Sequence, residues 1–288
     1  MKKCKHFVFL LFLIPFLNFA QDDLLDELNE ETSDVPNYET AAFKGLKIVN
    51  FESTKLVAKR EFFFNVQHRF GSVRNGFDDF FGLDDANTRI QFIYGISDGL
   101  NVGVSRSSIG QTYDAHVKYR IARQKVGGFP FTIAGYNLIA VNTELDSDVF
   151  PGLEFNDRLS YTSQLLISRK FTDALSLEVI PTFFHDNFVT NDDQDNAQFL
   201  LGAGGRYKLT KRFSINIDYG IHFNRADSSQ FENPLSVGVD IETGGHVFQL
   251  IFSNAQGITE NQFLGQANGD FFDGDFFFGF NLSRVFNF

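Results

Sequence analysis

The stretch FSINIDYGIHFN, residues 213–224, alternates apolar and polar positions throughout its length. Phe213, Ile215 and Ile217 begin one series, and Ser214 and Asn216 begin the other. Successive side chains of a β-strand point to opposite faces of the sheet. The stretch therefore predicts a strand with one apolar face and one polar face.

The same alternation recurs along the chain from about residue 60 and predicts eleven further strands. They fall near residues 61–70, 88–96, 99–106, 113–122, 129–140, 158–170, 174–183, 197–209, 234–242, 246–253 and 275–283. Most are about nine to eleven residues long or slightly longer, the length that a tilted strand needs to cross a bilayer. Strands of soluble domains are usually about five or six residues long.

The predicted connections alternate between short and long almost throughout. Short turns fall at 97–99, 124–128, 172–174, 210–212 and 243–245. Longer polar loops fall at 71–87, 141–157, 184–196, 224–233 and 254–274, with one brief exception at 107–112. Outer-membrane barrels have an even number of strands, short periplasmic turns and longer external loops. The pattern predicts a cell outer-membrane location, with both ends of the barrel domain facing the periplasm.

These features predict an all-β fold: a transmembrane, antiparallel, up-and-down β-barrel of about twelve strands. A soluble β-sandwich also shows alternating strands. The strands here are longer, and every apolar face is rich in Phe, Ile, Leu or Tyr, while the polar faces carry charged residues deep into the strands. A sheet in hydrocarbon must close on itself, because its backbone groups have no other hydrogen-bond partners.

The N-terminus has the layout of a secretory signal peptide. Basic Lys2, Lys3 and Lys5 precede the apolar residues 7–19, and Ala20 provides a small residue for cleavage. Cleavage would remove the only cysteine, Cys4, and would change the formal net charge from −11 to −14, because the removed segment holds three lysines and no acid. Such an acidic chain does not fit nucleic-acid binding.

The expected domain organisation has three parts. Residues 1–20 form the signal peptide, residues 21–58 an acidic periplasmic segment, and residues 59–288 the barrel. Within the acidic segment, residues 22–42 are interpreted as a solvated tail, with a short plug or partner-docking helix before Pro36 as the alternative. Residues 43–58 receive no assignment.

Charged and histidine side chains on the polar faces are predicted to line the barrel interior. They are Arg69, Arg89, Asp114, His116, Lys118, Arg120, Glu178, Arg206, Asp218, His222, Asp240 and Glu242. One interpretation is a narrow channel for small polar solutes, in which these charges tune selectivity. The alternative is a closed barrel that serves as an anchor or envelope-complex subunit, with the charges paired across the interior.

Three further groups of residues are weaker candidates. Asp240, Glu242 and His246 flank a turn, but they do not form a specific metal-ligand pattern. The acidic loops at 145–148, 190–196 and 270–275 offer oxygen ligands for Ca²⁺, yet solvated loops are the preferred interpretation. A lipid-modifying enzyme would need His68 near Ser72, Ser107 or Ser108, and we expect no enzymatic activity, cofactor or metal.

Several segments resemble one known family. They include VQHRFGS at 66–72, TYDAHVKYRIARQ at 112–124, LLISRKF at 165–171, GFNLSRVF at 279–286 and the DIETGGHVFQL run at 240–250. These resemble the Bacteroidota outer-membrane β-barrel proteins known as the DUF5777 domain of unknown function. The resemblance implies an outer-membrane barrel and transfers no catalytic or binding residue.

The C-terminal strand ends at Phe288, which resembles the signal read by the barrel-assembly machinery. The expected partners are therefore this machinery during biogenesis and outer-membrane lipid. The residues leave the transported solute, the oligomeric state and any partner protein open.

Overall fold

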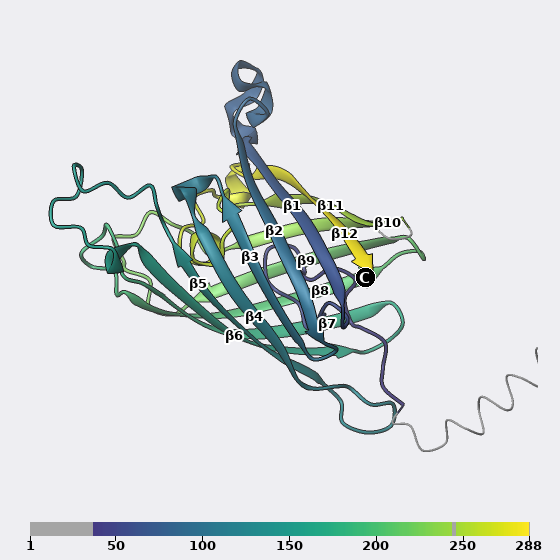
Figure 1. Cartoon of the computed structure of the whole chain (residues 1–288). Helices are drawn as coiled ribbons and strands as arrows, with labels where there is room; N and C mark the ends of the chain where they lie inside the picture. The colour runs from purple at the N-terminus through teal and green to yellow at the C-terminus, as the bar shows by residue number, and fades with distance from the viewer. Residues whose placement is uncertain (1–36, 244–245, 288) are drawn as a thin grey trace, which may run out of the picture. The chain divides into compact units, whose positions relative to one another are not determined.

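The computed structural model describes residues 37–243 and 246–287. Twelve antiparallel strands in this part of the chain form one closed barrel, as the alternation predicted (Figure 1). The strands are β1 (Glu61–Ser72), β2 (Ala86–Ser97), β3 (Leu100–Ser107), β4 (Tyr113–Ala122), β5 (Thr132–Val141), β6 (Leu159–Lys170), β7 (Leu175–Asp186), β8 (Ala197–Lys208), β9 (Phe213–His222), β10 (Leu235–Thr243), β11 (His246–Ser253) and β12 (Phe277–Asn287). The short helical elements are η1 (Val73–Gly82), η2 (Ile109–Gln111), η3 (Asn156–Arg158), α2 (Glu260–Gly265) and η4 (Phe271–Asp273).

Pairing of the first strand with the last closes the barrel. β1 and β12 pair from Glu61 opposite Asn287 to Ser72 opposite Phe277, with an irregularity between Arg69 and Ser72. Every other strand pairs with its two neighbours in sequence. The ladder leaves no unpaired sheet edge, so the wall satisfies its own backbone groups and can sit in hydrocarbon.

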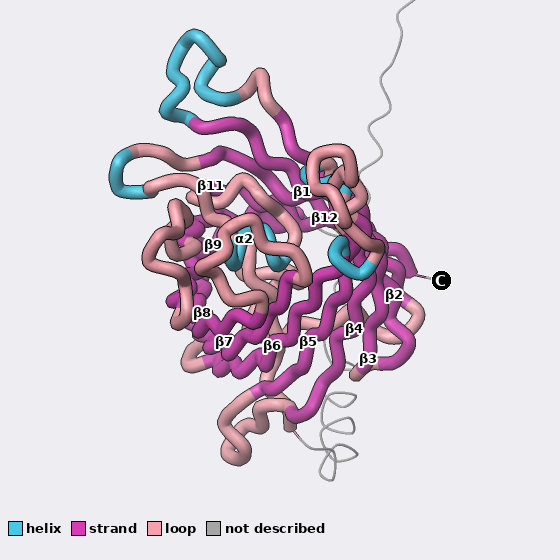
Figure 2. The backbone as a smooth tube through the Cα atoms, turned by 90° about the vertical axis from the view of Figure 1, so that its left-hand side faces the viewer, coloured by secondary structure: helices cyan, strands magenta, loops and turns pink. Residues whose placement is uncertain are grey.

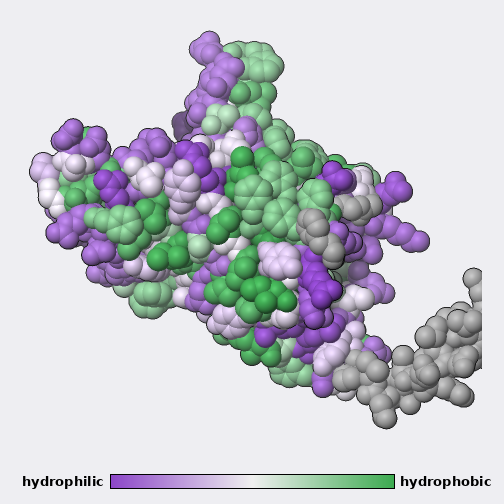
Figure 3. Space-filling view, in the orientation of Figure 1, coloured by the Kyte–Doolittle hydropathy of each residue, from purple (hydrophilic) through white to green (hydrophobic). Residues whose placement is uncertain are grey.

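The outer face of the barrel is apolar and exposed. On β9, Ile215, Ile217 and Ile221 are 42%, 49% and 47% exposed, while the intervening polar residues are buried. Figure 3 shows apolar residues gathered over the strands and polar residues at the loops. A soluble protein rarely exposes such a continuous apolar surface, but a barrel wall in contact with lipid requires it.

No helix in the described ranges is long and apolar enough to cross a membrane.

The two ends of the barrel differ as predicted. One end, here called the turn end, carries the short connections between β2 and β3, β6 and β7, and β8 and β9, together with the start of β1 and the end of β12. The other, called the loop end, carries the long connections that contain η1, η3, α2 and η4. The connection with η2 is the one brief link at the loop end, also as expected.

Candidate functional site

Most of the interior residues proposed from sequence lie buried on the inner face of the wall. Arg69, Arg89, Asp114, His116, Lys118, Glu178, Arg206, Asp218, His222 and Asp240 all belong to the buried polar set. Arg120 and Glu242 are only partly buried, near the turn end. Arg120 donates to the carbonyl oxygen of Asp98 at 2.5 Å, and Glu242 pairs with Arg206 at 2.7 Å.

The interior of the barrel is filled by a segment that precedes β1. Residues 43–58, here called the plug, include Phe43, Ile48, Val49 and Phe51, which are at most 2% exposed. From the sequence, residues 21–58 are expected to form a segment apart from the barrel, and residues 43–58 have no assignment. In the structure, residues 43–58 pack against the inner wall, in one buried cluster with residues of β5, β6, β7 and β8. The part of the acidic segment before residue 37 lies outside the described residues.

The centre of the plug is a tight backbone loop. The amide of Ile48 donates to the carbonyl of Phe51 at 2.8 Å, and the amide of Ser53 donates to the carbonyl of Leu46 at 2.9 Å. Lys47 and Glu52 form an isolated antiparallel bridge between them. The loop satisfies part of its own backbone and directs Val49 and Asn50 at its tip towards the wall.

The tip of the plug is held by one carboxylate of the wall. Oδ2 of Asp218 accepts from the backbone amides of Val49, Asn50 and Phe51 at 2.9, 2.8 and 3.0 Å. Charge-assisted hydrogen bonds of this kind are stronger than neutral ones. Arg69 of β1 donates to the side-chain oxygen of Asn50 at 2.7 Å. These contacts assign two of the predicted interior residues to plug binding.

Two lysines and one glutamate form an ion cluster between the plug and the wall. Glu52 lies 2.8 Å from the ammonium of Lys47 and 2.6 Å from that of Lys118 on β4. Lys118 also donates to the plug carbonyls of Leu46 and Ser53 at 3.1 and 3.0 Å. All three ion-pairing side chains are at most 5% exposed. Removing one member of a buried ion pair typically costs about 3–5 kcal/mol, because the remaining charge is left uncompensated.

Charges on the plug, the wall and the loop insert together keep Glu52 and Lys47 in their charged forms. Burial would raise the pKa of Glu52, but the nearby ammonium groups of Lys118 and Lys47 outweigh burial and hold this pKa well below its usual range. Burial would likewise lower the pKa of Lys47, but Glu260 and Glu52 outweigh it and raise that pKa. Both side chains are therefore charged at neutral pH.

A second segment enters the interior from the loop end. Residues 254–268, here called the loop insert, contain α2, which lies within the ring of strands in Figure 2. Thr259 and Gln262 form a capping box at its N-terminus, and Glu260, Phe263 and Leu264 are fully buried. Reciprocal capping satisfies the first amides of this short helix, which lacks the length to be stable alone.

The loop insert and the plug meet inside the barrel. Glu260 lies 2.8 Å from Lys47 of the plug and 3.2 Å from Arg89 on β2, and Arg89 in turn pairs with Asp114 on β4 at 2.8 Å. The rings of Phe51 and Phe263 pack edge to face, with centroids 5.2 Å apart. Glu260 thus links the plug to the wall, a role that sequence reasoning missed.

Three glycines on β8 and β9 leave space for the side chains of the plug. A Cβ atom at Gly202 would lie 2.5 Å from Cε1 of Phe51, and one at Gly204 would lie 2.7 Å from Cδ1 of Ile48. Gly220 approaches Phe51 in the same way, with 3.0 Å to Cζ. We call these three residues the glycine wall. Inward glycines beside a large apolar side chain show that the wall is shaped to this occupant.

The remaining predicted groups do not form a second site. Among the described residues, no group of three or more His, Cys, Asp or Glu could hold a metal ion. Nδ1 of His68 hydrogen-bonds Oγ1 of Thr88 at 2.8 Å rather than a serine, and Ser72 bonds Asp275. Ser107 is fully buried, and Ser108 donates to Asn87 at 2.5 Å.

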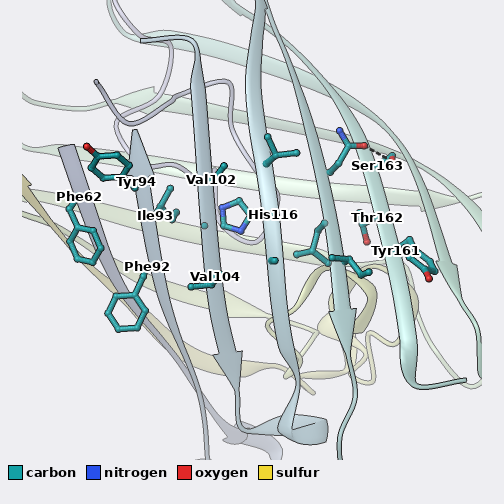
Figure 4. A pocket seen from close by; sticks show the side chains of 16 residues that line it. Phe62, Phe92, Ile93, Tyr94, Val102, Val104, His116, Tyr161, Thr162 and Ser163 are labelled. Carbon is teal, nitrogen blue, oxygen red and sulfur yellow. Dashed lines mark hydrogen bonds between the residues drawn. The ribbon is translucent and has the colours of Figure 1, made fainter. Parts of the chain in front are cut away.

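One hollow on the outer wall is lined largely by apolar side chains. It has a volume of about 700 Å³ and lies over β1 to β6, between Phe62 on one side and Tyr161 on the other (Figure 4). Val102 and Val104 belong to its floor. Because it opens on the lipid-facing surface, we interpret it as space that acyl chains fill, not as a site for a polar solute.

The fold and its interior define a class: a membrane-bound β-barrel with two chain segments packed inside it. The family model described as membrane bound beta barrel domain (DUF5777) matches residues 43–286, and the chain belongs to this family. The match begins at residue 43 and so includes the plug.

Comparisons with other proteins add little to this assignment. No curated protein matches the chain. Among solved structures, the KdgM porin has 10% identity and a TM-score of 0.48 over 78% of this chain and 99% of that chain. The NanC porin has 10% identity and a TM-score of 0.48 over 77% and 98%. The COG4313 outer membrane channel from Pseudomonas putida F1 has 14% identity and a TM-score of 0.45 over 81% and 97%. At these values no function is transferred to this chain.

Proposed function

We propose that the protein is a non-enzymatic outer-membrane barrel whose channel for small polar solutes is closed at rest by the plug. The turn end, with both ends of the barrel domain, would face the periplasm, and the loop end would face the outside. Lipid and the barrel-assembly machinery would be its partners. The bacterial group of origin stays a prediction from the resemblance.

The observation that carries this proposal is the ionic contact of the plug with the wall. Lys47 and Glu52 of the plug and Lys118 of β4 are charged, buried and hydrogen-bonded. The contact between the plug and this part of the wall is therefore polar. If the plug leaves, the wall that it uncovers carries Lys118, Glu178 and Asp218, whose charged groups suit a water-filled path. A purely structural filling needs no such charges, since apolar side chains of similar volume often fill a core equally well or better.

A permanently closed anchor is the second candidate, and the glycine wall favours it. Phe51 and Ile48 fit the space left by Gly202 and Gly204, and this apolar contact stabilises the inserted plug. Displacement of the plug would expose Phe51 and would cost about 1.5–3 kcal/mol for that side chain alone.

Conductance in planar bilayers tests the proposal. The purified full chain should show only rare openings, and deletion of residues 43–57 should produce discrete, lasting openings. Deletion of residues 23–36, which precede the plug, is the matched control and should remain closed. Resistance to cold detergent on gels would verify that each variant is a folded barrel.

Two outcomes would overturn the channel. A folded deletion variant without openings would leave the closed anchor as the function. Steady openings of the intact chain would show that the plug does not close the path.

A further inference from the structure

A second hollow, at the loop end, is separate from the contacts that hold the plug. It has a volume of about 380 Å³, at the lower end of the range for small-molecule sites. Its lining comes from the β5–β6, β7–β8 and β9–β10 connections and from α2. Asp186, Phe188, Gln198, Phe231 and Asn261 contribute to it. The hollow therefore depends on four segments that are far apart in sequence.

The charge around this hollow is strongly negative. Residues 142–158, 186–196 and 223–234 together hold eleven acidic and two basic residues. One of these bases, Arg158, lies in the lining, and it donates to the carbonyl of Thr143 at 3.5 Å. Like-signed acidic residues around a concave surface repel anions and raise the local concentration of cations. The surroundings thus select the sign of a ligand but not its shape.

Asp186 provides a fixed acceptor in the lining of the hollow. The residue is 7% exposed, and its Oδ1 accepts from the side chain of Asn261 on α2 at 3.1 Å. Its second carboxylate oxygen has no hydrogen-bond partner among the described residues. A buried carboxylate is costly unless it is paired, so a cationic group in the hollow would supply the missing partner.

Aromatic side chains complete the lining. Phe188 and Phe231 both line the hollow, and Phe188 is braced by Phe150, whose ring centroid lies 4.8 Å away at an interplanar angle of 66°. Aromatic faces attract ammonium groups when these lie within about 6 Å of the ring. No metal-binding group of acids and histidines exists among the described residues. The lining that the structure describes holds only two carboxylates, Asp157 and Asp186, and these beside aromatic rings suit an organic cation better than a metal ion, which needs more oxygen ligands.

We propose that this hollow binds a small organic cation, with its ammonium group against Asp186 and its carbon atoms against Phe188 and Phe231. Asn261 in the lining is next in sequence to Glu260, which contacts the plug. Binding of the cation itself does not depend on the proposed channel.

Saturation-transfer NMR on the full chain in detergent micelles tests the site. The probe is choline, and the control ligand is 3,3-dimethylbutan-1-ol, in which a neutral carbon replaces the charged nitrogen at equal shape. Choline should receive saturation from the protein, and the neutral analogue should receive at least several-fold less.

Three variants locate the site that gives the saturation transfer. Asp186→Asn removes the charge, keeps an acceptor for Asn261 and should abolish the transfer to choline. Asp192→Asn removes a charge from an exposed position of the β7–β8 connection, which follows Asp186, and should leave most of the transfer intact. Phe231→Ala, in the β9–β10 connection, should also weaken binding and serves if Asp186→Asn does not fold.

Several results would overturn the proposal: no transfer to choline, equal transfer to the neutral analogue, or a signal that survives both Asp186→Asn and Phe231→Ala. None of these results bears on closure by the plug, because the conductance experiment uses no organic cation. A chain that conducts without the deletion would, conversely, leave the binding result standing.

Discussion

At the scale of single residues, Glu52 determines how the plug is held. It compensates two buried ammonium groups, Lys47 and Lys118, and no other acid lies within ion-pairing distance of Lys118 in the described part of the chain. Lys47 has a second partner in Glu260. The loss of the Glu52 charge should therefore affect Lys118 most.

The lowered pKa of Glu52 predicts how closure depends on pH. Its contribution is complete above the ordinary carboxyl pKa of 4.5 and is lost as the pH falls through the lower pKa of the folded state. Lys47 has the opposite sign: its contribution is complete below 10.5 and is lost as the pH rises through its raised pKa. Bilayer conductance should stay low from about pH 5 to 10 and should rise in stronger acid.

The variant Glu52→Gln should be partly open across this range. Breaking the buried pair costs about 3 kcal/mol, which corresponds to on the order of a hundredfold increase in the open fraction. Glu154→Gln, at an exposed loop position, is the control and should behave as the wild type. Wild-type opening already at pH 6, or a Glu52→Gln variant that stays closed, would contradict this role of Glu52.

At the scale of elements, β8 shows how one strand serves two environments. Gly202 and Gly204 face the plug, while Phe199, Ala203 and Tyr207 point outwards. The outer face needs apolar area, and the inner face needs space. A substitution on the inner face of β8 should therefore affect the plug, whereas one on the outer face should not.

Gly202→Ala should loosen the plug without opening the barrel wall. The new Cβ atom would lie 2.5 Å from Phe51, which must move, whereas the strand ladder is unchanged. We expect this variant to conduct more than the wild type in planar bilayers. The temperature at which the barrel unfolds on gels should be the same for both.

Combination with Phe51→Leu should relieve much of the effect, because the smaller side chain leaves room for the methyl group, so the two substitutions should be non-additive. Gly205→Ala is the matched control on the outer face, where the new atom meets the flexible end of Leu177 at 2.8 Å and makes an ordinary contact with the carbonyl oxygen of Ser176 at 3.4 Å. Equal conductance for Gly202→Ala and Gly205→Ala would argue against a wall shaped to the plug.

The strands could be predicted from sequence, but the filling of the barrel could not. Alternation depends on neighbouring residues, so Ile217 and Asp218 reveal their opposite faces locally. The plug depends on contacts such as Lys47 with Glu260, which are 213 positions apart. A signal was nevertheless present: Leu46, Ile48, Val49 and Phe51 are too apolar for a solvated tail. The inward-facing glycines at 202, 204 and 220 were a second signal, because they leave space inside the barrel that another segment of the chain must fill.

At the scale of the whole molecule, the two ends of the barrel predict its orientation. In a background in which Cys4 is replaced by Ser, Asp192→Cys at the loop end should react with a membrane-impermeant maleimide on intact cells. Asp173→Cys, whose side chain is fully exposed at the turn end, should react only after the outer membrane is permeabilised. The reverse pattern would place the long loops in the periplasm.

The positions of the two inserts along the chain have a consequence for biogenesis. The plug immediately precedes β1 and the loop insert precedes β12, and these are the two strands that meet to close the cylinder. The segments that occupy the core are thus tethered to the seam itself. We therefore expect the pairing of β1 with β12 and the filling of the core to be coupled during assembly.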